Sequence, residues 1–192
     1  TNPQESCFCT SMDVDPAASK DVDVMFNDTG DEFIVEAFTT SGEYLLKITE
    51  GFKNATGTDM KMAKSVESEA RKKLTRAIDT RGVSKKLQAC FNDEDFWEQV
   101  AAKCVSCGIC TFLCPTCFCF DINDEMVRKQ GARYRGWDSC SFRLYTRMPM
   151  ENPREEKWRR VRQRVCHKFE FYPMNLDIFA CTGCGRCIQL CP

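Results

Sequence analysis

The hydrophobic pattern of the first third of the chain predicts short strands. Apolar residues cluster at 22–26 and 33–38, on either side of the turn-forming run 27–31, and again at 44–48 after a Ser-Gly pair. Short apolar runs bounded by Gly, Asn and Asp are typical of strands joined by tight turns. This part of the sequence therefore predicts a small meander.

Three later stretches carry helix signals. From 59 to about 80 the sequence contains Lys, Glu, Ala, Met and Leu at helical spacing, and Gly82 provides a helix stop. The acidic run 92–95 reads as a helix start before an aromatic and apolar stretch that leads into Cys104. A further helix is predicted from Pro153 to about His167, after a loop rich in Gly, Arg and aromatic residues.

These elements predict an α+β fold in two parts. Residues 1–85 form a small mixed α/β domain. Residues 86–192 form a helix-rich domain with an insertion at 116–180, between two cysteine-rich runs. The insertion is longer than the spacing in compact bacterial ferredoxins, which favours a helical ferredoxin-like domain.

Length and charge narrow the class of protein. A chain of 192 residues can bury a core without disulfides, and its formal charge of −1 gives no global preference for nucleic acid or an anionic membrane. No apolar run reaches 18 residues and no signal peptide is visible, so we expect a cytoplasmic protein without a membrane span. The chain starts with Thr1 and stops at Pro192, directly after a cysteine run, which suggests a fragment of a longer polypeptide.

Eight of the fifteen cysteines fall into two runs of identical spacing. Both runs read C-x2-C-x2-C-x3-C-P, the first from Cys104 to Pro115 and the second from Cys181 to Pro192. The two-residue gaps let one turning loop present three thiolates to three corners of a 4Fe–4S cluster. Gly108 and Gly185, each after a second cysteine, suit a backbone with positive φ or a close approach to the cluster.

In two-cluster ferredoxins the fourth cysteine of each run binds the other cluster. This crossed ligation assigns Cys104, Cys107, Cys110 and Cys191 to one cluster, and Cys181, Cys184, Cys187 and Cys114 to the other. Structural zinc is the alternative, but zinc sites pair C-x2-C knuckles and do not repeat three cysteines followed by Cys-Pro. The spacing favours two 4Fe–4S clusters.

The motifs indicate electron transfer and no bond chemistry at the clusters. Each iron has a cysteine ligand, so neither cluster offers an open position for a substrate. The chain also lacks a G-x-G-x-x-G turn and a P-loop, and we expect no flavin or nucleotide site in it.

The remaining cysteines leave two interpretations open. Cys7-Phe8-Cys9 and Cys117-Phe118-Cys119 repeat one tripeptide, and Cys140 ends the sequence Trp-Asp-Ser-Cys. These five cysteines form a third cluster or are small buried hydrophobic residues near the other two. The isolated Cys90 and Cys166 are expected in the core.

The insertion is basic and aromatic. Residues 128–172 contain thirteen Lys or Arg against five Asp or Glu, with aromatic residues between them. Such composition occurs in proteins that bind single-stranded nucleic acid. The cysteine runs favour another role, in which the cations offset the negative charge of thiolate-bound clusters or dock an acidic partner. His167, the only histidine, reads as a structural residue at a helix end.

The chain resembles the β subunit of soluble sulfhydrogenases and the A subunit of anaerobic sulfite reductase. The resemblance rests on the C-F-C segments, on Cys114-Pro-Thr-Cys-Phe-Cys-Phe-Asp121 and on Trp137-Asp-Ser-Cys140. The resemblance runs from Cys7 to the end. It implies a dicluster subunit that works beside a flavin- and NAD(P)-binding subunit and a catalytic subunit of hydrogenase, sulfite reductase or heterodisulfide reductase type. Members of that family extend beyond this chain at both ends.

The leading hypothesis is therefore an electron-transfer subunit of a multi-subunit oxidoreductase in an anaerobe. An enzyme with its own reactive cluster, or with a thiol pair at Cys117 and Cys119, is the alternative. A regulatory module that binds nucleic acid through the basic insertion is a third class, and the absence of a global positive charge argues against it.

Overall fold

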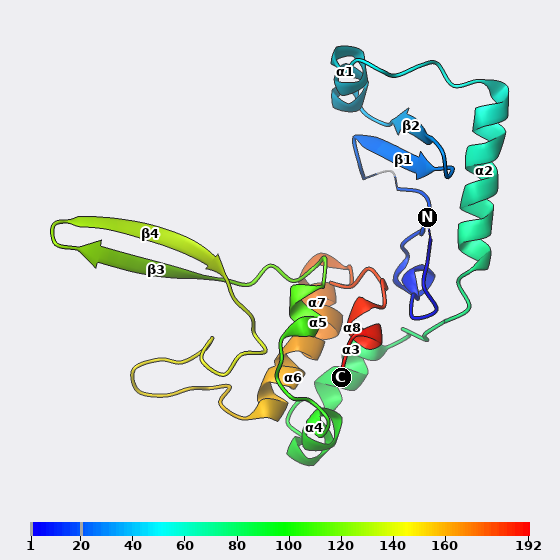
Figure 1. The fold of residues 1–192 in the computed structure, drawn as a ribbon. Coiled ribbons are helices and arrows are strands. Elements are labelled where there is room, and N and C mark those ends of the chain that lie inside the picture. The colour runs from blue at the N-terminus through cyan, green and yellow to red at the C-terminus, as the bar shows by residue number, and fades with distance from the viewer. Residues whose placement is uncertain (1, 20) are drawn as a thin grey trace. The chain divides into compact units, whose positions relative to one another are not determined.

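The computed structural model describes residues 2–19 and 21–192, which form two compact units (Figure 1). The first unit contains residues 1–79 and the short segment 183–185, and the second contains residues 80–182 and 186–192. The predicted division into domains 1–85 and 86–192 stays a prediction.

The first unit begins with a short helical turn and a hairpin. Its elements are η1 (Cys9–Met12), β1 (Val24–Asp28), β2 (Phe33–Ala37), α1 (Thr40–Ile48) and α2 (Gly57–Lys72). Strands β1 and β2 pair antiparallel, with Val24 opposite Ala37 and Asp28 opposite Phe33. The first two predicted strands are therefore confirmed.

The third predicted strand, 44–48, is wrong: these residues end helix α1. The Thr39 side chain caps that helix by accepting a hydrogen bond from Gly42 N at 3.1 Å. Gly42 itself is required by packing, since a Cβ there would lie 2.0 Å from the Asp23 carbonyl oxygen. The Ser41-Gly42 pair, which suggests a turn between strands, instead lies in the first turn of a helix.

Helix α2 is confirmed but has different limits from the predicted 59–80. It starts at Gly57 because Thr56 and Asp59 form a capping box, in which Asp59 Oδ2 accepts from Thr56 N at 2.7 Å. It ends at Lys72. Gly82 does not end this helix but precedes the next one, with a left-handed φ of 66°.

The second unit is helical except for one hairpin. Its elements are α3 (Val83–Ala89), α4 (Glu94–Ala101), α5 (Ile109–Phe112), β3 (Phe120–Val127), β4 (Gln130–Trp137), α6 (Lys157–Cys166), the π-helical turn η2 (His167–Phe171), α7 (Tyr172–Leu176) and α8 (Arg186–Gln189). The helix predicted after the acidic run 92–95 is confirmed as α4, and the helix predicted from Pro153 to about His167 is confirmed as α6, which starts only at Lys157. Helices together with small antiparallel sheets confirm the α+β class.

The core of this unit lies where α4 packs against α6. Trp97 from α4 and Trp158 from α6 are buried together with Cys166, and Trp97 Nε1 donates to the Cys90 carbonyl at 2.9 Å. Cys166 is fully buried and Cys90 packs against the same cluster, so their expected place in the core is confirmed.

The hairpin β3–β4 was predicted as a loop. Figure 1 shows it extending from the helices of the second unit. Its strands pair antiparallel over eight residues each, and every residue is exposed. Cross-strand pairs hold it, among them Arg133 with Asp124 and Arg135 over the Phe120 ring. Since both faces meet solvent, the apolar alternation that identifies a strand is weak here.

No helix in the described part of the chain combines the length and the apolar character that a membrane span requires.

Replacing Trp97 by Ala should destabilise the second unit by about 3–5 kcal/mol, because it removes a buried aromatic side chain and a hydrogen bond. Urea unfolding followed by far-UV circular dichroism under anaerobic conditions measures the effect as a lower midpoint. Val100→Ala, on the exposed side of the same helix, is the control and should leave the midpoint nearly unchanged. Equal midpoints for both variants would contradict the assigned core.

Candidate metal centre

The first cysteine run follows directly from helix α4. Cys104 N donates to the Ala101 carbonyl at 2.9 Å, which continues the last helical turn into the run. Gly108 then takes a left-handed φ of 76° and precedes α5. A Cβ on Gly108 would lie 2.6 Å from the Phe142 ring, so this position requires glycine for its conformation and for packing. The predicted positive φ of Gly108 and Gly185 is confirmed.

Cys110 is the point at which thiols of the two runs approach each other. Helices α5 and α8 pack together, and the Cys110 thiol interacts electrostatically with those of Cys104 and Cys187. Burial raises the pKa of Cys110, and the nearby Arg164 guanidinium and a hydrogen bond with Ser141 oppose that rise. The second unit thus brings the third cysteine of each run into one neighbourhood.

Arg164 on α6 is the cation of this neighbourhood. Its Nη2 donates to the Cys110 carbonyl at 2.9 Å, and its charge interacts with Cys110, Cys187 and Cys117. Burial lowers the pKa of Arg164, but the charges of these thiolates outweigh that effect and the pKa is raised. Its Nε is buried without a hydrogen-bond acceptor among the described residues. An anionic group bound by the surrounding thiolates would give that donor a partner.

Lys168, in η2, is a second buried cation, only 3% exposed. Its Nζ donates to Thr116 Oγ1 and to the Ala180 carbonyl, both at 2.8 Å. Both acceptors are neutral, whereas an ammonium removed from water needs an opposite charge nearby. Clusters bound by four thiolates carry net negative charge and fit this requirement.

Cys114 and Cys117 form a hydrogen-bonded thiol pair beside Lys168. The hydrogen bond from Cys117 lowers the pKa of Cys114 to about 4, burial acts in the opposite direction, and Thr116 and Lys168 contribute to the lowering. The same bond raises the pKa of Cys117. The ionised form of Cys114, the form that a metal ligand requires, is therefore favoured.

The sequence Trp-Asp-Ser-Cys packs against the first run. Ser139 and Thr111 are both buried, and their hydroxyls lie 2.6 Å apart. The rings of Phe112 and Trp137 meet edge to face at 5.3 Å. Two segments far apart in sequence thus fix the loop that carries the first run.

Arg160, also buried, connects three loops to α6. Its Nε donates to the Ser141 carbonyl at 3.1 Å, one Nη to Arg154 O at 3.0 Å, and the other to Ser106 Oγ at 3.2 Å. Ser106 lies between the first two cysteines of the run and has a left-handed φ of 57°. Arg160 therefore holds the strained part of the first run in place.

In the first unit, the N-terminal C-F-C segment packs on residues 183–185 of the second run. Phe8 N donates to the Gly183 carbonyl at 2.7 Å, and Cys7 Sγ donates to the Cys184 carbonyl at 3.3 Å. A Cβ on Gly185 would lie 2.3 Å from the Ser6 carbonyl oxygen. The two glycines of the second run accommodate this segment.

The donors fit 4Fe–4S clusters. Among the described residues, no group of three or more His, Cys, Asp or Glu side chains converges to hold a single metal ion. A cubane has a different requirement, because each of its cysteines binds a separate iron. The four-cysteine sets that contain the exposed Cys107 and Cys191, and the five-cysteine third cluster, stay predictions.

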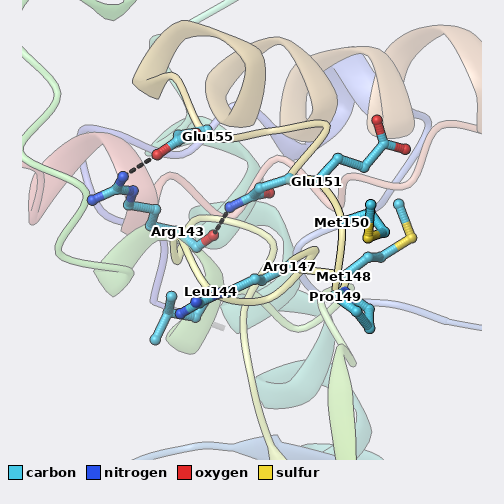
Figure 2. A pocket seen from close by; sticks show the side chains of 9 residues that line it. Arg143, Leu144, Arg147, Met148, Pro149, Met150, Glu151 and Glu155 are labelled. Carbon is cyan, nitrogen blue, oxygen red and sulfur yellow. Dashed lines mark hydrogen bonds and ion pairs between the residues drawn. The ribbon is translucent and has the colours of Figure 1, made fainter.

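Part of the basic insertion folds on itself. Nine residues between Arg143 and Glu155 line a hollow of about 390 Å³, and Figure 2 shows the ion pair that joins these two residues. Asn152 Nδ2 donates to the Arg143 carbonyl at 2.7 Å. The ion pair offsets the charge of Arg143, one of the thirteen cations of the insertion.

The sequence predicted cations near the clusters but not which ones. Arg160, Arg164 and Lys168 are spaced four residues apart, which places them on one side of a helix. This spacing in the sequence could have indicated that the three cations lie together. The buried Ser139 and Thr111 carried none, since their pairing depends on tertiary contacts.

Comparisons with known proteins agree with the cysteine pattern. Residues 103–192 match the family described as "4Fe-4S dicluster domain". The chain is 32% identical over 193 residues to sulfhydrogenase 2 subunit beta of Pyrococcus furiosus, an alignment that covers 99% of this chain and 57% of the relative. The chain thus spans little more than half of the curated relative it matches. No solved structure matches.

Replacing Arg164 by Gln should lower the reduction potentials of the bound clusters, because a cation that favours the reduced, more negative state is lost. The shift should be on the order of 100 mV, as for a unit charge several ångströms away at an effective dielectric constant of about 20. EPR-monitored redox titration measures it. Arg159→Gln on the same helix, where Arg159 pairs with Glu156, is the control. Equal potentials in both variants would contradict the role of Arg164.

Proposed function

We propose that this homologue of a sulfhydrogenase beta subunit, with its 4Fe–4S dicluster domain, is an electron-transfer subunit of a multi-subunit oxidoreductase. The observation that carries the proposal is the combination of two complete C-x2-C-x2-C-x3-C-P runs with two nearby cations, the buried Lys168 and the half-buried Arg164, whose Nε is enclosed. Complete cysteine ligation leaves no iron for a substrate, and buried cations offset a fixed negative charge.

Each cluster is held by three cysteines of one run and the last cysteine of the other. Cys104, Cys107, Cys110 and Cys191 bind one cluster, and Cys181, Cys184, Cys187 and Cys114 bind the second. When bound, each cluster supplies a site that gains or loses one electron. The chain itself supplies the thiolates, their orientation and the surrounding charge.

The surroundings of the thiolates support rapid electron exchange. Arg164 and Lys168 are fixed by hydrogen bonds to backbone carbonyls and to Thr116, so they need little rearrangement when the cluster charge changes. The contacts of Arg160 and of Ser139 with Thr111 keep the first run in one conformation. A fixed polar environment lowers the reorganisation that accompanies transfer.

The partners follow from the proposed role as an electron carrier. Its curated relative is named as a subunit of a sulfhydrogenase, which supports a hetero-oligomer. A flavoprotein that binds NAD(P) would exchange electrons with one cluster, and a catalytic subunit of hydrogenase, sulfite reductase or heterodisulfide reductase type with the other. We place this assembly in the cytoplasm of an anaerobe.

The full-length protein, purified anaerobically with its partner subunits, should contain at least about eight iron and eight acid-labile sulfide atoms per chain, four for each cluster. Cys104→Ser should reduce the iron content and the partner-dependent turnover with reduced dye. Cys90→Ala, in the core away from the runs, is the matched control and should keep both.

Zinc without acid-labile sulfide would contradict the proposal. Turnover by the isolated chain with reduced dye and an added acceptor would instead favour the alternative of an enzyme with its own reactive thiols, since a carrier needs its partners.

A further inference from the structure

Three cysteines outside the two runs face one cavity in the second unit. Cys117, Cys119 and Cys140 line a space of about 280 Å³, bordered also by Arg164 and Lys168. A water molecule occupies about 30 Å³ in the liquid. The cavity therefore has room for a group of several atoms.

The hairpin β3–β4 explains how these cysteines meet. Cys119 precedes β3 and Cys140 follows β4, and the base of the hairpin is closed where Asp138 N donates to the Cys119 carbonyl at 3.2 Å. The thiols of Cys119 and Cys140 interact directly. Cys117 lies two residues before Cys119, and its N–H donates to the Cys114 carbonyl at 3.2 Å. Strand pairing thus joins the second C-F-C segment to Cys140.

The surroundings favour an anionic group bound by thiolates. The two cations that border the cavity are the buried Lys168, hydrogen-bonded to neutral oxygens, and Arg164, with its unpartnered Nε. In the described part of the chain, the cysteines do not converge on a point where one ion would bind. Thiolates spread around a cavity suit a multi-iron cluster, in which each binds its own iron.

A fourth iron would need another ligand. Within the same unit, Cys90 and Cys166 belong to the core around Trp97. His167 lines the cavity and begins the π-helical turn η2. π-Helical turns are rare and occur frequently at functional sites, and imidazole replaces cysteine as an iron ligand in some clusters.

We propose that this cavity holds a third 4Fe–4S cluster, bound by Cys117, Cys119 and Cys140 with His167 at the fourth iron. The site is additional to the two clusters of the cysteine runs. It differs from the five-cysteine cluster predicted from the sequence, because Cys7 and Cys9 belong to the first unit, against residues 183–185. Cys117 contacts Cys114, the last cysteine of the first run, so the new site is a neighbour of the cluster that Cys114 is proposed to bind.

The test compares iron and acid-labile sulfide in the full-length protein, purified anaerobically, with those in the double variant Cys119→Ser/Cys140→Ser. We expect about twelve iron atoms per chain in the natural protein and about eight in the double variant. Cys90→Ala is the control and should keep about twelve. Equal iron contents in the natural protein and the double variant would overturn the proposal.

The difference in iron content between the natural protein and the double variant measures only the third cluster. The iron that remains in the double variant measures the other two. Loss of all iron from the double variant would show a folding failure. Mössbauer and EPR spectra of the natural protein then decide, and a total of two clusters overturns the proposal.

His167→Cys tests the fourth ligand. Since histidine in place of cysteine raises a cluster's potential, this variant should keep its iron and lower the potential of one cluster out of three. Unchanged potentials would remove His167 from the ligand set.

Discussion

Buried positive charge is the constraint on which the second unit depends. Lys168 donates to two neutral oxygens, those of the Thr116 hydroxyl and the Ala180 carbonyl, and the buried Nε of Arg164 has no hydrogen-bond acceptor among the described residues. Transfer of such cations from water costs several kcal/mol each unless an anion compensates for it. Cys114, whose pKa is lowered to about 4, supplies one negative charge near Lys168, and clusters bound by the surrounding thiolates would supply more. If the proposed clusters bind here, we expect folding of this unit to be coupled to cluster binding, as in other small metal-binding domains.

The helical core converts this constraint into a defined geometry. Helix α4 leads into Cys104 and helix α6 carries Arg164, and the packing of Trp97 and Trp158 fixes the two helices against each other. Arg160 adds hydrogen bonds from α6 to the loop of the first run. The distance between cation and thiolate is thus set by apolar packing some way from the cysteines.

The chemistry of the site was more predictable from the sequence than the fold around it. The cysteine spacing indicated 4Fe–4S clusters because ligand geometry is local, and the caps of α2 and α4 are local as well. Residues 44–48 were assigned wrongly because Gly42 suggests a turn in the sequence, whereas in the structure it allows close packing against the Asp23 backbone. The hairpin β3–β4 was missed because its exposed faces lack a hydrophobic alternation. Ser139 and Thr111 became significant only once the fold had brought them together.

The contact of the N-terminal C-F-C segment with Gly183 has a consequence for biosynthesis. Phe8 and Gly183 are separated by most of the chain, and a ribosome adds about 5–20 residues per second. Residues 6–9 are consequently synthesised roughly ten seconds or more before residues 183–185, on which they pack. During that interval the Cys7 and Cys9 thiols are open to oxidants, which would convert them to a disulfide or sulfenic acid. Since Cys9 is buried in the folded chain, its thiol is more open to oxidants during translation than afterwards.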